Sequence, residues 1–360
     1  MQKDLLDKGQ RLLSYNNLAS NLVDWKKDES TSFLKIAPAQ TFQQTLKNFD
    51  RALQDAFDKK QHSKKFPILK KRGISDSFRY PQSFKIKGNQ IFLPKIGWVK
   101  YFNSKKVEGT PKNVTVSRNG EYWFVSIQIE FKIPTPVHPS KKIIGIDLGI
   151  ANFATFSDGN ILKPLNSFRR TEKQLGKAQK DLTKKIKFSS NWKKQKRNVQ
   201  RIHTKIANTR KDFLHKKSTT IANENQVVIL EDLKVSNMSK SAKGTLEKPG
   251  KNVNAKAELN KAILDQGWFE FKRQIEYKLN WMGGEMVLIN LKNISCKCSV
   301  CGYTSKKNRT TQSKFFCIEC GHTQNADINA SLNILTAGHA VLACGDIKPI
   351  YGLSPRIAFL

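Results

Sequence analysis

Two pairs of closely spaced cysteines constrain the fold of this chain more than any other feature. Cys298 and Cys301 form one C-x2-C knuckle, and Cys317 and Cys320 form a second knuckle after an interval of 15 residues. Each knuckle turns two thiolates toward a common point, and two knuckles together complete the tetrahedral site that structural zinc prefers. We therefore predict a zinc ribbon in which these four cysteines hold one structural Zn²⁺.

The alternative to a zinc site is a pair of disulfides, which intracellular proteins rarely contain. The N-terminal segment lacks the apolar stretch of a signal peptide, and no run approaches the roughly 18 apolar residues of a membrane span. We therefore predict a cytoplasmic protein without a membrane partner and favour zinc. Cys296 is close enough in sequence to compete as a ligand, whereas Cys344 reads as an ordinary thiol.

The chain carries a large excess of positive charge. Its 360 residues include 64 lysines and arginines and 29 aspartates and glutamates, which gives a formal net charge of +35. A field of this size requires a polyanionic partner, so nucleic acid is the expected one. A basic structural protein of the ribosomal or chromatin type is the alternative, and charge alone does not separate the two.

The first part of the chain changes from helical to strand periodicity. Apolar residues recur at steps of three and four within 37–58, which predicts an amphipathic helix. The period becomes two within 78–131, and Asn119-Gly120 predicts a type I′ hairpin turn because both of its central residues take positive φ. A proline cluster then predicts a domain boundary: Pro134, Pro136 and Pro139.

The middle of the chain is helical in tendency and basic. Residues 168–217 are dense in lysine and arginine with Phe188 and Trp192 among them, which indicates either a solvated face or contacts to a nucleic-acid backbone. Residues 236–257 predict a flexible loop. The apolar spacing from Leu264 to Leu279 then predicts one helix, and a strand follows it.

Three acidic residues occupy unusual surroundings. Asp147 lies in an apolar strand, where a carboxylate is costly unless a cation compensates its charge. Glu231 ends a run of apolar residues typical of a buried central strand, and Asp232 would then face the opposite side. Asp327 begins an apparent helix, where its alternative role is that of an N-cap.

The three carboxylates together suit metal-dependent hydrolysis. On two buried strands and a helix start, they could hold two Mg²⁺ ions about 4 Å apart, one activating water and the other stabilising a leaving 3′ oxygen. We therefore predict that Asp147, Glu231 and Asp327 bind catalytic Mg²⁺ and cleave a phosphodiester backbone.

The order of these motifs resembles the TnpB (OrfB) family of transposon-encoded, RNA-guided nucleases, which are related to type V CRISPR effectors. The resemblance runs from about Phe42 to Asp346 and includes GIDLG, ILEDL, the two knuckles and DINASLNI. It implies a guide RNA from the transposon end, a DNA target, a separate transposase for joining DNA ends, and cleavage by a RuvC domain. It also places Asp147, Glu231 and Asp327 at the catalytic positions and the four cysteines at the zinc positions.

The resemblance further implies an α/β fold with a defined order of parts. An RNase H-like RuvC nuclease domain with an inserted zinc ribbon would follow a helical segment and a β-barrel-like wedge module. The expected parts are a shortened helical recognition-like region at 1–75, the wedge at 76–138, a RuvC-like domain with a basic helical insertion at 139–292, the zinc ribbon at 293–324, the final RuvC segment at 325–346 and a tail at 347–360.

Two features depart from the family pattern. By comparison with the family we expect the chain to start after the first strand and helix that family members usually have, and Asn325-Ala326 stands where the usual Asp-Arg precedes the third acid. The main hypothesis is a Mg²⁺-dependent, RNA-guided DNA endonuclease associated with the nucleoid of a prokaryotic cell. The alternative is a nuclease-impaired regulator that binds RNA and DNA, or a decaying accessory protein of a transposase.

Overall fold

The chain folds into two compact units, which are described separately. Unit 1 comprises Met1–Lys132 and Tyr351–Leu360, and unit 2 comprises Ile133–Ile350. The computed structural model describes residues 2–58, 60, 64–68, 76–104, 107–131, 136–245, 247–290, 294–344 and 358–359. Some predicted boundaries fall outside these residues: Pro134, the end of 1–75, residue 293 and most of 347–360. Within the described residues, no helix has the length and apolar character needed to cross a membrane.

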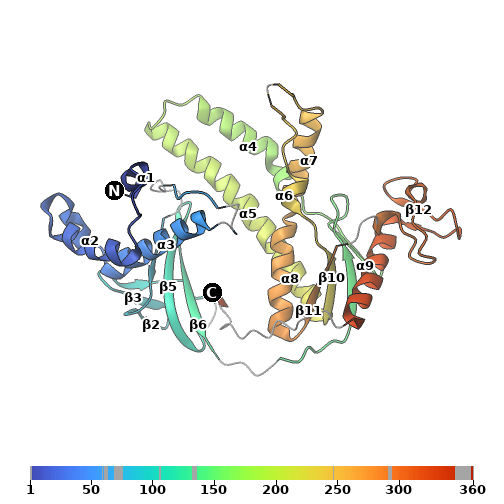
Figure 1. The fold of residues 1–360 in the computed structure, drawn as a ribbon, viewed down its shortest axis with the longest axis horizontal. Helices are drawn as coiled ribbons and strands as arrows, with labels where there is room; N and C mark the ends of the chain where they lie inside the picture. Colours follow the sequence, from blue (N-terminus) through green and yellow to red (C-terminus); the bar gives the residue numbers. More distant parts are fainter. Residues whose placement is uncertain are drawn as a thin grey trace. The chain divides into compact units, whose positions relative to one another are not determined.

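Unit 1 combines helices with two antiparallel sheets (Figure 1). The predicted amphipathic helix is confirmed as α3 (Ala39–Phe57), which follows α1 (Gln2–Asp7), α2 (Tyr15–Lys27) and the 3-10 helix η1 (Glu29–Lys35). The first sheet has the order β1 (Ser77–Tyr80), β5 (Thr110–Asn119), β6 (Tyr122–Glu130) and β14 (Ala358–Phe359). The second sheet has the order β2 (Lys85–Lys87), β3 (Gln90–Leu93) and β4 (Gly97–Lys100).

A single apolar core joins the two sheets of unit 1. Side chains at every second position of the strands point into it, as the period of two predicts. Its fully buried members are Tyr80, Ile91, Leu93, Val114, Val116, Ile127 and Ile129.

The predicted hairpin between β5 and β6 is confirmed, but its turn differs from the prediction. Asn119 pairs with Tyr122, so the two central residues are Gly120 and Glu121 rather than Asn119 and Gly120. Among the described residues of this turn, Gly120 has a positive φ (62°). Glycine at the first central position is the pattern of a type II′ turn, in which only that residue must be left-handed. The cross-strand register therefore decides which residues form the turn.

A mixed sheet forms the centre of unit 2. Its order is β11 (Glu285–Ile289), β10 (Val227–Glu231), β7 (Ile143–Asp147), β8 (Ala154–Phe156) and β9 (Ile161–Leu162). The first three strands run parallel, and β8 and β9 are antiparallel. The parallel strands are apolar at nearly every position, as expected for strands that are covered on both faces.

Helices cover both faces of this sheet (Figure 1). Alternate residues of β7 and β10, such as Ile146 and Leu230, pack against α5 (Ser190–Glu224) and α8 (Trp268–Met282). The intervening residues, such as Ile229, pack against α9 (Ala326–Ala343) on the other face. The remaining helices of unit 2 are α4 (Ser167–Thr183), α6 (Val235–Met238) and α7 (Val253–Gln266).

Two predicted boundaries in unit 2 are wrong. The apolar spacing from Leu264 to Leu279 predicts one helix, but the chain breaks at Gly267, which has φ +71° and ends α7 where α8 begins. Only glycine adopts this left-handed conformation at little cost. The predicted loop 236–257 instead includes most of α6 and the start of α7, and a hydrogen bond from Lys256 Nζ to the Met238 carbonyl links the two helices.

Candidate metal centre and acidic cluster

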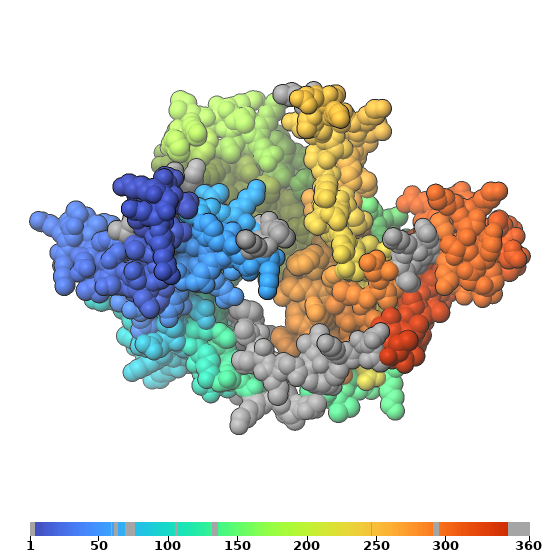
Figure 2. Space-filling view, viewed as in Figure 1, coloured from blue at the N-terminus to red at the C-terminus, as the bar shows by residue number. Residues whose placement is uncertain are grey.

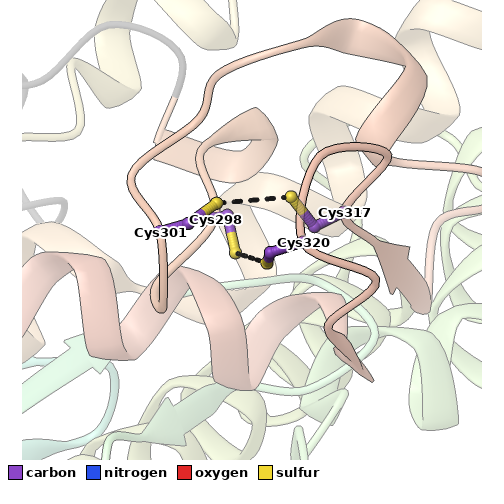
Figure 3. Close-up of side chains that lie close together, drawn as sticks. All are labelled: Cys298, Cys301, Cys317 and Cys320. Carbon is purple, nitrogen blue, oxygen red and sulfur yellow. Dashed lines mark hydrogen bonds between the residues drawn. The ribbon is translucent and has the colours of Figure 1, made fainter.

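The four predicted cysteine ligands lie together in a small module between β11 and α9 (Figure 3). Their sulfur atoms are all within 4.8 Å of one another. Cys298 Sγ is 3.7 Å from Cys320 Sγ, and Cys301 Sγ is 3.5 Å from Cys317 Sγ. These separations exceed the length of a disulfide bond, about 2.05 Å. They are close to the roughly 3.8 Å expected between thiolates at the corners of a tetrahedron with metal–sulfur bonds of about 2.3 Å. The geometry therefore supports a metal site and excludes disulfides in this arrangement.

Each knuckle closes with a glycine in the left-handed conformation. Gly302 (φ +78°) donates its N–H to the Cys298 carbonyl at 3.0 Å, and Gly321 (φ +73°) donates to the Cys317 carbonyl at 2.9 Å. These bonds make the two turns alike and turn the thiols of each pair toward the same point. Cys296, the predicted competitor, does not belong to the group of converging sulfurs.

The cysteine module is bound to α9 by buried amide side chains. The module contains η2 (Ile294–Cys296), η3 (Lys306–Asn308), β12 (Lys314–Phe316) and β13 (Thr323–Asn325). Asn329 and Asn333 of α9 each donate a hydrogen bond of 2.7 Å to the Lys297 carbonyl, one residue before the first knuckle. The Asn329 side chain also accepts from the Ser299 N–H at 2.9 Å. Figure 2 shows the module (orange) as a lobe beside α9 (red).

Asp147 and Glu231 lie side by side at the ends of neighbouring strands. Asp147 is the last residue of β7 and Glu231 the last residue of β10, and both are partly buried. The parallel register pairs Ile146 with Leu230, so the two acids follow at the next matched position. Matched residues of adjacent strands face the same side of a sheet. Both carboxylates therefore lie on the face that α9 covers.

Asp327 comes to the same place from α9. It lies in the first turn of the helix, but it is not the N-cap that its sequence position also allowed. Asn325 caps the helix, accepting from the N–H groups of Asp327 and Ile328 at 2.9 and 3.3 Å. The Asp327 carboxylate is therefore left free of capping and accepts a 3.0 Å hydrogen bond from Asn152 Nδ2.

Two glycines allow α9 to lie close to the strands that carry the other acids. A Cβ at Gly145 of β7 would be 2.5 Å from the Ser331 carbonyl oxygen and 2.7 Å from the Leu335 nitrogen. A Cβ at Gly338 of α9 would be 2.2 Å from Ile229 Cδ1 of β10. Such distances are far inside van der Waals contact, so only glycine fits at either position. The close approach of helix and strands brings Asp327 toward Asp147.

Asp327 and Glu231 act electrostatically on Asp147. Burial, together with the negative charges of Asp327 and Glu231, raises the pKa of Asp147 from 3.8 to about 7. Burial also raises the pKa of Glu231. The guanidinium of Arg309 opposes the rise at Asp147 and lies 3.9 Å from Asp327 Oδ1. The structure thus concentrates negative charge at one end of the sheet.

The carboxylates are less tightly grouped than the sulfurs. Among the described residues, the cysteines are the one group of at least three histidine, cysteine or acidic side chains whose ligand atoms all lie within 4.8 Å. Asp232 does not join the acids, because it faces α8 and accepts a 2.9 Å hydrogen bond from Lys272. This position agrees with the prediction that Asp232 would face the opposite side of the sheet.

Two neighbours of the acids carry no clear signal in the sequence. Arg309 lies between the two knuckles in the sequence, far from Asp147, so the sequence does not show that the two residues are close in space. Asn152 follows β7 and links Asp327 to Lys163, whose Nζ donates to Asn152 Oδ1 at 3.0 Å. The Asp-Arg pair that family members usually have before the third acid is absent here. The guanidinium of Arg309, which belongs to the cysteine module, lies near Asp327 instead.

Known proteins show similarity over nearly the whole chain. The OrfB_IS605 family, described as "Probable transposase", matches residues 126–242, and the "Cas12f1-like, TNB domain" family matches residues 268–334. The "Putative RNA-guided DNA endonuclease InsQ" of Escherichia coli is 49% identical over 96% of this chain and 86% of its own length. A "Putative RNA-guided DNA endonuclease" of Streptomyces pristinaespiralis is 36% identical over 94% of this chain and 82% of its own length.

Solved structures resemble the chain more weakly. A cryo-EM structure of a Cas12f1–sgRNA–target DNA complex aligns over 93% of this chain and 88% of that one, with 18% identity and a TM-score of 0.35. The chain belongs to the TnpB (OrfB) family, as the order of its motifs predicts.

Proposed function

We propose that this chain is a transposon-associated, RNA-guided DNA endonuclease that hydrolyses DNA in a RuvC-type, metal-dependent centre. Membership of the TnpB family and the names of the curated relatives support the substrate and the guide. The convergence of Asp147, Glu231 and Asp327 at one end of the sheet in unit 2 is the observation that carries the proposed chemistry.

The chemistry of the acidic cluster fits Mg²⁺. Carboxylate oxygens are the ligands that this cation prefers. Burial first, and then the charges of Asp327 and Glu231, raise the pKa of Asp147, so a bound cation would stabilise its ionised form. Bound Mg²⁺ would supply an activated water and stabilise the leaving 3′ oxygen. Two ions shared among three carboxylates do not require every oxygen to be close to a single point, which agrees with the looser spacing of the acids.

The residues around the acids would orient the reacting groups. The strand ends fix Asp147 and Glu231, and Asn152 holds the Asp327 carboxylate through its 3.0 Å hydrogen bond. Arg309 would offer its guanidinium to a phosphate oxygen of the bound strand, because planar guanidinium groups pair well with phosphate. A carboxylate cluster would otherwise repel the DNA backbone, so this cation has a direct use at the site.

The four cysteines would hold a structural zinc ion. With four protein ligands the site would leave no position open for substrate, so its role would be to keep the module folded on α9. Through the hydrogen bonds from Asn329 and Asn333 to the Lys297 carbonyl, a folded module would also hold in place the helix that carries Asp327. Arg309, which lies between the knuckles, would be positioned by the same ion.

The finer domain assignments follow from the same proposal. Unit 2 would be the RNase H-like RuvC domain with the zinc ribbon inserted before its last segment, a reading that the mixed sheet with helices on both faces supports. The sheets of unit 1 would be the β-barrel-like wedge. Base pairing between guide RNA and target would provide sequence specificity, while basic surfaces hold the backbones, and a separate transposase would join DNA ends.

Guided cleavage by the purified complex tests the proposal. The chain is co-expressed with its native flanking DNA, the RNA that purifies with it is sequenced, and a DNA target matching that RNA is offered with and without Mg²⁺. Cleavage is expected with Mg²⁺ and is expected to disappear in Asp147→Asn while target binding remains. Asp232→Asn is the matched control, since this acid is adjacent in sequence to Glu231 but faces α8, and it should still cut.

Other outcomes separate the alternatives. Guided binding without cutting by the native chain would favour the nuclease-impaired regulator. Unchanged cutting by Asp147→Asn would show that the acidic cluster is not the catalytic centre. Absence of a specific co-purifying RNA would contradict the guided mechanism itself.

A further inference from the structure

The turn between α4 and α5 exposes apolar side chains at one end of a helical hairpin. Ile186 is 82% exposed and Phe188 is 67% exposed, and Trp192 is partly exposed in the first turn of α5. Figure 1 shows that the two helices join at the end of the hairpin that is farthest from the sheet of unit 2. In Figure 2 this part of the chain (light green) is open at the surface. The unit's own core does not use these side chains.

The two aromatic rings form a pair that is flanked by ammonium groups. The ring centroids of Phe188 and Trp192 are 5.5 Å apart, with an angle of 58° between the ring planes. Lys187 Nζ lies 5.4 Å from the Phe188 centroid, and Lys196 Nζ lies 5.0 Å from the Trp192 centroid. The end of the hairpin is therefore both aromatic and cationic.

The position of Phe188 is held by the rest of the hairpin. Its φ of +71° is unfavourable for an aromatic residue, so the surrounding structure must impose it. Ser189 caps α5 by accepting from the Trp192 N–H at 3.1 Å, and Gln195 ties α5 to the Ala178 carbonyl of α4 at 2.9 Å. An apolar core fixes the two helices below the turn: Leu175, Ala178, Val199, Ile202 and Ile206. The exposed rings are thus presented on a rigid support.

The charge around the turn indicates the kind of partner. Between Asp181 and Asp212 the sequence contains eleven lysines and arginines and no acidic residue. Lysine is depleted in the buried centres of protein–protein interfaces, which makes a protein partner a poor match for this surface. Aromatic rings within a lysine-rich surface are the combination with which proteins bind single-stranded nucleic acid, because bases stack on the rings while lysines contact phosphates.

We propose that Phe188 and Trp192 form a stacking site for an unpaired nucleobase, in a strand whose phosphates contact Lys187 and Lys196. The site would accept any base, because every base offers a π-face on which an aromatic ring can stack. This inference rests on the nucleic-acid partner of the proposed function, but it does not depend on cleavage.

Fluorescent oligonucleotides test the site in the full-length chain. A single strand that contains 2-aminopurine is titrated without Mg²⁺, as DNA in one series and as RNA in the other. Stacking on an aromatic ring quenches the fluorescence of this base. Phe188→Leu and Trp192→Leu keep apolar bulk but remove the ring, so each is expected to relieve quenching and weaken binding by about 5-fold to 150-fold. Phe188→Tyr and Trp192→Phe keep a ring and should retain most of the affinity.

Two controls separate stacking from charge and from misfolding. Phe269 on α8 is 69% exposed, nearly the same as Phe188, and Phe269→Leu should leave both signals unchanged. Lys187→Ala should reduce the salt dependence of binding by about 0.7 in the log–log slope, whereas Phe188→Leu should leave the slope unchanged. Thermal melting of each variant verifies that the hairpin remains folded.

The proposal is overturned if both leucine variants, folded like the native chain, bind and quench the strand as the native chain does. The DNA and RNA series show which strand the site prefers, and quenching in either series supports it. Because the assay uses neither guide nor Mg²⁺, a failure of guided cleavage with intact quenching would contradict only the proposed function.

Discussion

Replacing Asp147 with asparagine should make the Mg²⁺-free protein more stable while removing its nuclease activity. Asparagine has nearly the same shape but cannot ionise. In the native chain, burial and the charges of Asp327 and Glu231 raise the pKa of Asp147 from 3.8 to about 7. A difference of this size corresponds to about 4 kcal/mol at 1.36 kcal/mol for each pKa unit. Ionised Asp147 therefore destabilises the folded state.

The direction of the pH dependence follows from the sign of the shift. Because the folded-state pKa lies above the ordinary value, the folded state binds the proton more tightly than the unfolded state. The stabilisation from this proton is complete below about pH 4 and is lost as the pH rises to about 7. The advantage of Asp147→Asn over the native chain should therefore grow from about 2 kcal/mol at pH 5 to about 4 kcal/mol at pH 8.

Thermal unfolding in Mg²⁺-free buffer measures this advantage. For a domain of the size of unit 2, about 4 kcal/mol corresponds to an increase in Tm of roughly 8–16 °C at pH 8. Added Mg²⁺ should raise the Tm of the native chain more than that of the variant, because it stabilises the ionised acid. The matched control is Asp232→Asn. The hydrogen bond from Lys272 lowers the pKa of Asp232, so removing this charge should lower the stability at neutral pH.

A specific result would refute the reasoning. If Asp147→Asn at pH 8 without Mg²⁺ melts no higher than the native chain, the charge on Asp147 is not a cost to the fold. The same conclusion holds if the difference between the two proteins does not shrink between pH 8 and pH 5.

Three further perturbations test other parts of the structure. Cys317→Ser should reduce bound zinc from one ion per chain to none by elemental analysis and lower the Tm of unit 2; a native chain without zinc would contradict the tetrathiolate site. Gly338→Ala should lower the free energy of unfolding, measured in urea, by about 1–3 kcal/mol because its Cβ would lie 2.2 Å from Ile229. Gly176→Ala in α4, where a Cβ meets open space, should instead raise the free energy of unfolding by about 0.5–1 kcal/mol. Equal effects of the two substitutions would refute the close packing of α9. Arg309→Gln should raise the pKa of Asp147 further, so the fall in the free energy of unfolding with rising pH, measured without Mg²⁺, should continue to higher pH. If the pH dependence of stability is the same as in the native chain, this guanidinium does not act on the acids.

Local patterns account for the parts of the fold that the sequence predicts well. The amphipathic spacing in 37–58 depends on residues within a few turns of one another, and α3 forms where it predicts. The knuckles are equally local, because each C-x2-C pair and its glycine close their own turn. Boundaries were less predictable where a single backbone conformation decides them. Gly267 divides an apolar repeat that would otherwise continue, and the β5–β6 register moves the hairpin turn by one residue.

The acidic cluster shows the limit of what residue types can reveal. A carboxylate in an apolar strand marks Asp147 and Glu231 as unusual, since burying a charge is costly. Nothing in the spacing of the sequence shows that Arg309 acts on the same acids, or that Asn152 holds Asp327. These contacts arise because Gly145 and Gly338 let α9 lie close to the sheet and because the cysteine module is bound to that helix.

The sequence by itself therefore determined the residue types of the two candidate sites and the elements that carry them: four cysteines in two knuckles, two acids at strand ends and a third at a helix start. These are short-range properties, set by spacing and by the periods of helix and strand. Only the tertiary structure decided that the three acids meet at one face of one sheet and that the Arg309 guanidinium of the cysteine module lies beside them. It did so because packing of α9 against β7 and β10, through two glycines, brings together residues that are far apart in the chain.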